Sequence, residues 1–385
     1  MVTGAPNYPY GKVFPGYRNP IYQVEQMDGV RVIRTWSSIS PKKTFWPRIF
    51  HYGSYSATAF YGGLLAGRPD IVISYSPPLP LGITAWLLGC IWGVPWVLQI
   101  EDLFPDAAVA AGMLTNRAAI SFFTRMELFL YRRTERISVI CENFRDQIHQ
   151  KGNFDAKIAV IPVWGDPDSI CPQVKMNAFR EKHGLREAFV VLYAGNLGLT
   201  SCLEDVVRAA EFLRTEEGVR FVIVGEGVKK KDLEEDTRSR GLENILFLPY
   251  QPRETFAEMM AAADISLVTL NQSAAKTSLP SKIYNIMASA RPILAIAPDH
   301  TEICRLVTGS KCGLQVCPGN PDEIADAILW SKSHTEELCK MGENGRALLE
   351  MQFSRKRCAD RYEEMLLEVV EEGRNERKGI RHMAS

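Results

Sequence analysis

From about Gly29 onward, hydrophobic and polar residues alternate between two kinds of segment. Short β-branched apolar runs of strand length are followed by longer segments whose apolar residues recur three and four positions apart. Because the turns between them are short, the pattern predicts parallel α/β sheets. In the first half the predicted strands are Val30–Thr35, Asp70–Tyr75, Trp96–Ile100, Ile137–Cys141 and Lys157–Ile161, and the predicted helices are Arg48–Ala66, Leu81–Trp92, Asn116–Arg133 and Glu142–Lys151.

The second half repeats this pattern after a polar, Pro- and Gly-containing linker at Pro162–Pro172. We therefore predict two doubly wound domains in series, residues 1–165 and 166–353, with a cleft between them at the carboxyl ends of the strands. Residues 354–385 form a C-terminal helix, expected to pack back towards the first domain, and a tail. The predicted strands are Phe189–Ala194, Arg220–Val224, Ile245–Leu248, Ile265–Thr269 and Ile293–Ile296, and the helices are Leu203–Arg214, Lys229–Arg240, Arg253–Ala262, Ser281–Ala290 and Ser354–Glu371.

Two segments test this organisation. Met1–Pro6 looks like the end of a strand running into a loop, so we expect the N-terminal domain to lack its first strand and helix. Ile71–Ile100 carries no charge and is long enough to span a bilayer, but four prolines and three glycines divide it. A strand, a loop, a buried helix and a second strand fit it better than a membrane span.

Composition narrows the class of protein. Hydrophobic residues make up 46% of the chain and charged residues 23%, as in a soluble globular protein, and the zero formal net charge gives no reason to expect nucleic acid binding. The nine cysteines are scattered, which suits reduced thiols in a cytoplasm, and no secretory signal is visible at the N-terminus.

The turn Gly195–Gly198 is the strongest candidate for chemistry. It follows a β-branched run and precedes a helix, so its glycines would let the backbone approach a ligand, and helix-start N–H groups would attract an anion such as phosphate. A tight turn without a ligand explains the same residues. Lys282 begins another predicted helix, where a cation is electrostatically unfavourable, and this favours an anionic partner for it.

Several motifs occur in order along the chain: TGAPNYPYGKVFPGYRN, VLQIEDLFPDAAVAAGML and ISVICENFRDQI in the first half, and AGNLG, FVIVGEG, LPYQP, AAADISLVTL and SLPSKIYNIMASARPILA in the second. Together they resemble glycosyltransferase family 4 (group 1), retaining nucleotide-sugar transferases of the two-domain GT-B fold, and most of all its WbuB-like branch. The resemblance covers nearly the whole chain. It implies transfer of a sugar, an amino sugar in this branch, from a UDP-sugar to a lipid-linked or saccharide acceptor during bacterial surface-polysaccharide synthesis.

The resemblance also implies which residues act. The donor would be bound by backbone groups and side chains in the second domain, with Lys282 stabilising the diphosphate leaving group and Glu302 accepting hydrogen bonds from the ribose. Glu302 could equally be an ordinary acidic residue of a helix first turn. Backbone groups near Tyr250–Arg253 would face the base. The implied donor-binding residues are Gly195, Asn196, Leu197, Gly198, Gly225, Ser281, Lys282 and Glu302.

On the acceptor side, Asp102 would position the acceptor, with support from Asp106, although Asp106 could simply cap the helix after Pro105. Retaining transfer of this class is usually argued to be a front-side attack that needs no protein base, so the catalytic residues implied are Asp102 and Lys282. The sequence Asp166-Pro167-Asp168 spells a metal-binding pattern, but in a linker it is ordinary turn chemistry, and we expect neither a metal nor a cofactor.

The sequence also departs from the family. Its two usual glutamates fall on Thr277 and Asn285, and the usual basic pair falls on Asn196 and Ser201, so diphosphate binding would depend on backbone, Lys282 and Lys276. Cys202 replaces a usual glycine, and the glycine-rich acceptor loop is not found. A non-catalytic or inactive nucleotide-sugar binder and a GT-B-fold epimerase therefore remain as alternatives.

The helical segment Asn116–Arg136 could touch a membrane. Apolar Ile120, Phe123, Met126 and Leu130 recur beside Arg117, Arg125, Arg132 and Arg136, a pattern typical of an interfacial helix and also of a core helix with a solvated face. The expected location is cytoplasmic, with peripheral contact to the inner face of the cytoplasmic membrane as one possibility.

Overall fold

The chain divides into two compact units, which are described separately. The computed structural model describes residues 1–7, 11–41 and 45–383. The N-terminal unit comprises Met1–Ile161 and Tyr362–Ser385, and the C-terminal unit comprises Pro162–Arg361. The motif TGAPNYPYGKVFPGYRN runs through residues 8–10, which lie outside the described residues.

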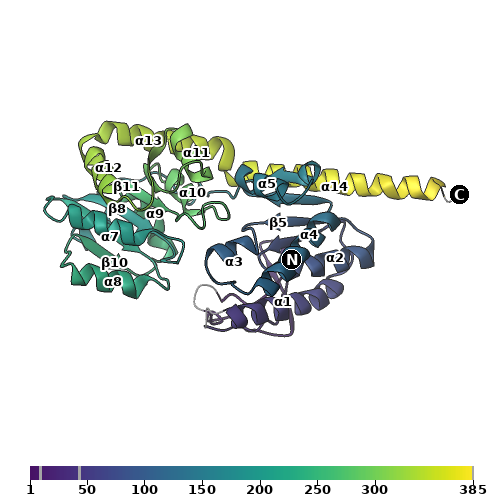
Figure 1. Cartoon of the computed structure of the whole chain (residues 1–385). Helices are drawn as coiled ribbons and strands as arrows, with labels where there is room; N and C mark the ends of the chain where they lie inside the picture. The colour runs from purple at the N-terminus through teal and green to yellow at the C-terminus, as the bar shows by residue number, and fades with distance from the viewer. Residues whose placement is uncertain (8–10, 42–44, 384–385) are drawn as a thin grey trace. The chain divides into compact units, whose positions relative to one another are not determined.

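The N-terminal unit contains two sheets, ordered β1-β3-β2 and β4-β5-β6-β7 (Figure 1). Each predicted strand of the first half is present to within two residues at either end. The elements are β1 (Val2–Thr3), β2 (Tyr22–Met27), β3 (Val30–Thr35), α1 (Phe45–Ala66), β4 (Val72–Ser76), α2 (Pro80–Trp92), β5 (Trp96–Ile100), α3 (Asp106–Ala110), α4 (Arg117–Arg133), β6 (Arg136–Val139), α5 (Glu142–His149), the 3-10 helix η1 (Asp155–Lys157) and β7 (Ile158–Val160).

The prediction of purely parallel sheets is wrong at one point. Strand β2 pairs antiparallel with β3, and the turn between them is Asp28-Gly29, where both residues have positive φ. An Asp-Gly pair between strands is a strong signal for a hairpin turn of this kind. The signal was present in the sequence, but the exposed, polar strand before it hid the hairpin.

Helix α14 (Arg355–Met383) covers one face of the second sheet from Tyr362 onward. The Tyr362 hydroxyl donates to Gln99 Oε1 at 2.5 Å, and the Arg136 guanidinium donates to both oxygens of Glu372. Because Tyr75, Gln99 and Ser138 are paired in register across β4, β5 and β6, they form one row beneath the helix.

The uncharged segment from Ile71 to Ile100 is confirmed as β4, α2 and β5, so it is part of the folded unit. Strand β5 is buried along its whole length. Among the helices that the structure describes, none is long and apolar enough to cross a membrane.

The membrane interpretation treated Asn116–Arg136 as one helix, but α4 ends at Arg133. Phe123 and Leu130 are buried within the unit, so that part of the apolar stripe is not available to a membrane. Arg136 is not in the helix but begins β6. The buried stripe also contains Glu127, a charge that the periodicity did not reveal.

The C-terminal unit is built on one parallel sheet ordered β10-β9-β8-β11-β12-β13. Alternate residues of β8 point into two different cores, Val190 and Leu192 into one and Val191 and Tyr193 into the other. The elements are α6 (Ala178–Lys182), β8 (Phe189–Ala194), α7 (Leu203–Phe212), β9 (Val219–Val224), α8 (Lys230–Ser239), β10 (Ile245–Leu248), α9 (Arg253–Ala261), β11 (Ile265–Thr269), α10 (Lys282–Ala288), β12 (Ile293–Ile296), α11 (Glu302–Gly309), β13 (Gly313–Val316), α12 (Pro321–Ser333), α13 (Thr335–Leu348) and the π-helical turn η2 (Leu349–Phe353).

Candidate functional site

The candidate donor residues lie along one edge of the C-terminal sheet. Gly195 follows β8, Gly225 follows β9, Lys282 lies beyond β11 and Glu302 beyond β12. Since these strands are parallel and in register, their carboxyl ends meet at the same edge. The strand order reverses between β8 and β11, which is the switch point where doubly wound sheets bind ligands.

Two glycine turns pack against each other at this switch point. A Cβ at Gly225 would lie 1.8 Å from the Gly195 carbonyl oxygen, and Gly225 has φ +149°. The Gly195 N–H donates to Val224 and the Leu197 N–H to Glu226, at 2.9 and 3.0 Å. The N–H groups of Gly195 and Leu197 are therefore already hydrogen-bonded, and the space that a side chain at Gly195 would fill is taken by the Lys282 side chain.

The rest of the turn is held from both sides. Leu197 is fully buried in the core, and the Tyr193 hydroxyl donates to the Asn196 carbonyl oxygen at 2.8 Å. Asn271, after β11, donates from its side chain to Leu199 and from its backbone to Thr200. Sequence reasoning missed Tyr193 and Asn271, because no local pattern indicates that distant loops meet here.

Lys282 lies across the Gly195 turn. Its Nζ is 3.5 Å from the centre of the Tyr193 ring, and a Cβ at Gly195 would lie 2.8 Å from the same atom. Among the described residues the Lys282 ammonium has no carboxylate partner, and burial lowers its pKa to about 7. Lys282 is also the first residue of α10, where the helix dipole disfavours a cation, and Ser281 before it makes no side-chain cap.

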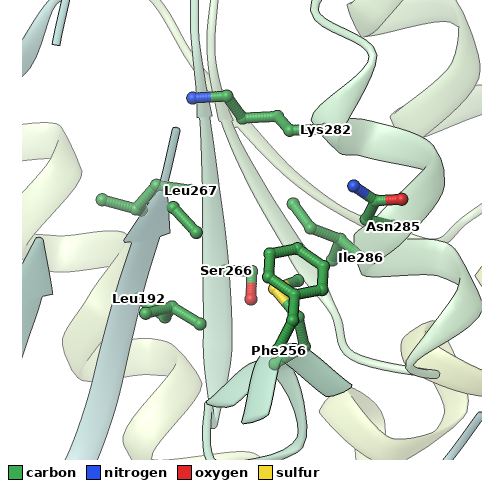
Figure 2. A pocket seen from close by; sticks show the side chains of 9 residues that line it. Leu192, Phe256, Ser266, Leu267, Lys282, Asn285 and Ile286 are labelled. Carbon is green, nitrogen blue, oxygen red and sulfur yellow. The ribbon is translucent and has the colours of Figure 1, made fainter. Parts of the chain in front are cut away.

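A small cavity lies beneath Lys282. It has a volume of about 20 Å³, enough for one water molecule, and Lys282 and Phe256 lie at opposite ends of the group that lines it (Figure 2). The Ser266 hydroxyl in it has no hydrogen-bond partner among the described residues. Asn285, aligned with one of the missing family glutamates, lines the same cavity, whereas Thr277, aligned with the other, is buried elsewhere.

The helix after the glycine turn contributes less to anion binding than its position suggested. Helix α7 carries Glu204 and Asp205 in its first turn, and Cys202 at its N-cap makes no side-chain hydrogen bond. These carboxylates already interact with the positive end of the helix. The positive end of α7 is therefore partly compensated by its own first-turn carboxylates.

Glu302 is the first residue of α11, and the Thr301 side chain caps this helix by accepting from the Cys304 N–H. The Glu302 carboxylate is mostly buried, and its Oε2 lies 3.7 Å from the Arg305 guanidinium. This placement is compatible with both interpretations of Glu302, the first-turn acid and the ribose ligand.

In the N-terminal unit, Asp102 lies in the loop between β5 and α3, at the carboxyl edge of its sheet. Asp106 does not cap α3, because Pro105 occupies the N-cap position. Its carboxylate instead pairs with Lys151 at 2.7 Å, and Lys151 also binds both oxygens of the fully buried Glu127. Desolvation raises the pKa of Glu127, and the nearby Lys151 opposes this shift.

The Asp166-Pro167-Asp168 sequence forms a turn. Asp166 accepts from the Ser169 hydroxyl and from the N–H groups of Ser169 and Asp168, and the Ser169 hydrogen bond lowers the pKa of Asp166. Within the described ranges, no group of three or more His, Cys, Asp or Glu side chains is arranged to hold a metal ion.

Comparison with known proteins places these features in a family. The model for glycosyl transferases group 1 matches residues 175–348, and the model for a glycosyl transferase 4-like domain matches residues 5–164. The "Probable glycosyltransferase WbjE" of Pseudomonas aeruginosa is 30% identical over 298 residues, 75% of this chain and 72% of that protein. The chain belongs to the group 1 glycosyltransferases. It is also 28% identical to the "Putative colanic acid biosynthesis glycosyl transferase WcaI" of Escherichia coli K12, over 82% of this chain and 79% of that one.

Solved structures confirm the two-domain GT-B fold for this glycosyltransferase. Anabaena Alr3699/HepE, solved in complex with UDP, superposes with a TM-score of 0.68 at 17% identity, covering 82% of each chain. Sucrose-phosphate synthase from Thermosynechococcus elongatus gives a TM-score of 0.71 at 16% identity, covering 92% of this chain and 86% of that one.

Proposed function

We propose that the C-terminal unit binds the diphosphate of a UDP-sugar between Lys282 and the Gly195–Gly198 turn. The observation that carries this proposal is Lys282 itself: a partly buried ammonium at a helix start, with no carboxylate partner among the described residues. A bound diphosphate would offset both the desolvation of the ammonium and its unfavourable interaction with the positive end of the α10 dipole. The similar fold of Alr3699/HepE, solved in complex with UDP-glucose, supports the choice of donor.

The remaining donor contacts follow the same sheet edge. Backbone N–H groups of Asn196 and Gly198, unlike those of Gly195 and Leu197, have no partner among the described residues and are available to the phosphates. Gly225 lets the neighbouring turn approach, Ser281 flanks Lys282, Glu302 accepts from the ribose hydroxyls, and backbone near Tyr250–Arg253 faces the base.

The transfer itself is a retaining substitution at the anomeric carbon of the sugar. The bond to the phosphate oxygen breaks, the acceptor oxygen forms the new bond on the same face, and the acceptor proton passes to the departing phosphate oxygen. Lys282 stabilises the charge that develops on this leaving group. Asp102 orients the acceptor hydroxyl, and Asp106 supports its loop, so no protein base and no metal are required.

The biological setting is bacterial surface-polysaccharide synthesis, in keeping with a relative named for colanic acid biosynthesis. The kanosaminyltransferase of Streptomyces kanamyceticus, 24% identical over 70% of this chain, is named for the transfer of an amino sugar, which supports an amino sugar here. The acceptor is a saccharide or a lipid-linked saccharide, met in the cytoplasm at the inner membrane face.

A nucleotide screen tests the donor site. UDP at about one hundred times its Kd should stabilise the chain by about 2.7 kcal/mol and raise its melting temperature by several degrees, whereas GDP and ADP should not. Lys282→Ala should abolish most of the shift, and Lys340→Ala, at an exposed lysine on α13, should leave it intact. No shift with any nucleotide, or an equal shift in Lys282→Ala, would refute the assignment.

Turnover is tested separately. With UDP-N-acetylglucosamine as donor and a saccharide or lipid-linked saccharide as acceptor, release of UDP in the presence of EDTA should match release without it, because the proposed site needs no metal. A chain that binds UDP but produces no UDP from any UDP-sugar would be the non-catalytic binder instead.

A further inference from the structure

Helix α1 of the N-terminal unit exposes an apolar stripe along its whole length. Trp46 is 76% exposed, Phe50 63% and Tyr61 51%, and Gly53, Ala57, Leu64 and Leu65 are exposed as well. Positions 46, 50, 53, 57, 61 and 64 recur three and four residues apart, so they share one face of the helix. At 22 residues the helix is about 33 Å long.

The opposite face of α1 is fixed against the unit, which sets the direction of the stripe. A Cβ at Gly62 would lie 2.6 Å from Thr35, and one at Gly63 would lie 2.5 Å from Leu88 of α2. The Thr84 hydroxyl of α2 donates to the Ser56 carbonyl oxygen at 2.9 Å. The stripe is therefore held outward by close contacts, and packing within the N-terminal unit does not require it to be apolar.

The helices beside α1 are poor in acids. Helix α1 packs against α2, which packs against α4, so the three form one layer (Figure 1). Neither α1 nor α2 contains Asp or Glu, and the only acid of α4 is the buried, paired Glu127. The exposed charges of the three helices are all arginines: Arg48, Arg117, Arg125, Arg132 and Arg133.

We propose that this layer docks on an anionic lipid bilayer, with α1 lying in the interface and its aromatic residues inserted. An apolar helix face beside basic residues is the pattern of interfacial binding, in which buried apolar area and attraction to anionic headgroups add together. The surface differs from the stripe on α4 suggested by sequence periodicity, because Phe123 and Leu130 of that stripe are buried. The inference extends the proposed use of lipid-linked acceptors.

Vesicle binding by the full chain, without nucleotide, tests this surface. The chain should co-sediment with vesicles of phosphatidylcholine and phosphatidylglycerol, bind vesicles of phosphatidylcholine alone more weakly, and dissociate as salt rises. Phe50→Glu should reduce partitioning about 10- to 100-fold. Phe212→Glu, on α7 of the C-terminal unit and 60% exposed, is the matched control and should bind as the unchanged chain does.

Several outcomes would overturn the proposal. Equal binding by Phe50→Glu and the unchanged chain would remove α1 from the contact, and no binding to either vesicle would exclude the docking surface. A dimer in sedimentation that Phe50→Glu dissociates, without vesicle binding, would make the stripe an interface between copies. Trp46→Glu repeats the test at a second exposed position, and UDP binding measured in parallel separates failure here from failure of the donor site.

Discussion

Two partly buried lysines, one in each unit, are surrounded in opposite ways. Lys151 in the N-terminal unit is bound by Asp106 and by both oxygens of Glu127. Lys282 in the C-terminal unit faces the ring of Tyr193 and has no carboxylate partner among the described residues. The first lysine is part of a closed ion-pair network that stabilises the fold, whereas the second is not neutralised by a carboxylate and is available to pair with an anionic ligand.

The difference matches what each unit is proposed to bind. A diphosphate brings its own negative charge, so the donor site needs a cation that no carboxylate has neutralised. An acceptor hydroxyl is neutral, and the loop that carries Asp102 needs a fixed position more than an uncompensated charge. Lys151 supplies that by tying Asp106, at the start of α3, to Glu127 on α4.

Replacing Lys151 by Met should have the largest effect, because it leaves Glu127 as a buried carboxylate without its cation. Breaking such a pair costs about 3–5 kcal/mol, and chemical denaturation should show this loss at pH 7. The loss should shrink as the pH falls, since burial has already raised the pKa of Glu127 and protonation removes the charge. Lys151→Met combined with Glu127→Gln should recover part of the stability; equal stability of Lys151→Met and the unchanged chain would contradict the closed network.

The same substitution at Lys282 should act in the opposite sense on stability and strongly on binding. Lys282→Met removes an unpaired, partly desolvated cation, so the free energy of unfolding should stay the same or rise slightly. UDP affinity, measured by calorimetry, should fall about 10- to 150-fold, as expected for losing one charged contact. A large loss of stability together with unchanged UDP affinity would make Lys282 a structural residue.

The strands that could be predicted best are the buried central ones. The predicted bounds of Trp96–Ile100, Phe189–Ala194, Ile265–Thr269 and Ile293–Ile296 are those of the structure. Parallel strands covered on both faces are continuous apolar runs, which makes them easy to recognise. The half-buried edge strand Ile245–Leu248 is predicted equally well, because it too is a continuous apolar run. Strand β2 is exposed and polar, and β13 is mostly half-buried and contains Gly313 and Gln315, so neither carries that signal.

In the candidate site, too, features formed by neighbouring residues could be predicted, and contacts between distant segments could not. The Gly195–Gly198 turn and Lys282 could be picked out because each has a pattern of its own. The contact of Lys282 with Tyr193, the close approach of Gly225 to Gly195 and the hydrogen bonds of Asn271 depend on strand order and register. No spacing along the chain encodes those contacts, so sequence alone could not find them.

The pH dependence of UDP binding sharpens the difference between the two lysines. Free Lys282 has a pKa of about 7, and a bound diphosphate should raise it towards the ordinary lysine value of about 10.4. Above pH 7 binding must therefore take up a proton, and affinity should fall up to about fivefold from pH 7 to pH 8, with a total loss at higher pH limited to the roughly 10- to 150-fold expected for the charged contact. Calorimetry in buffers of different ionisation enthalpy measures the proton directly.

Lys282→Arg provides the control for this proton. Its guanidinium stays charged throughout the range, so its UDP affinity should be nearly flat between pH 7 and pH 9. The stability of the free chain should change in the opposite direction to UDP affinity. Between about pH 7 and pH 10 the unfolded state binds more protons at Lys282 than the folded state does, so the free energy of unfolding should rise with pH. A flat profile in the unchanged chain would show that Lys282 does not meet the diphosphate.

Glu302 should give the smallest effect, because the part of the donor that it is proposed to contact, the ribose, is neutral. If its carboxylate accepts from the ribose, Glu302→Gln should weaken UDP binding about 2- to 10-fold, the range for one hydrogen bond. The decisive comparison is with 2′-deoxy-UDP and 3′-deoxy-UDP. One of these should bind the unchanged chain more weakly than UDP does. In Glu302→Gln that difference should disappear, since the carboxylate that would accept from the missing hydroxyl has already been replaced. If the difference persists in full, Glu302 is a first-turn acid of α11 and the ribose is bound elsewhere along the sheet edge.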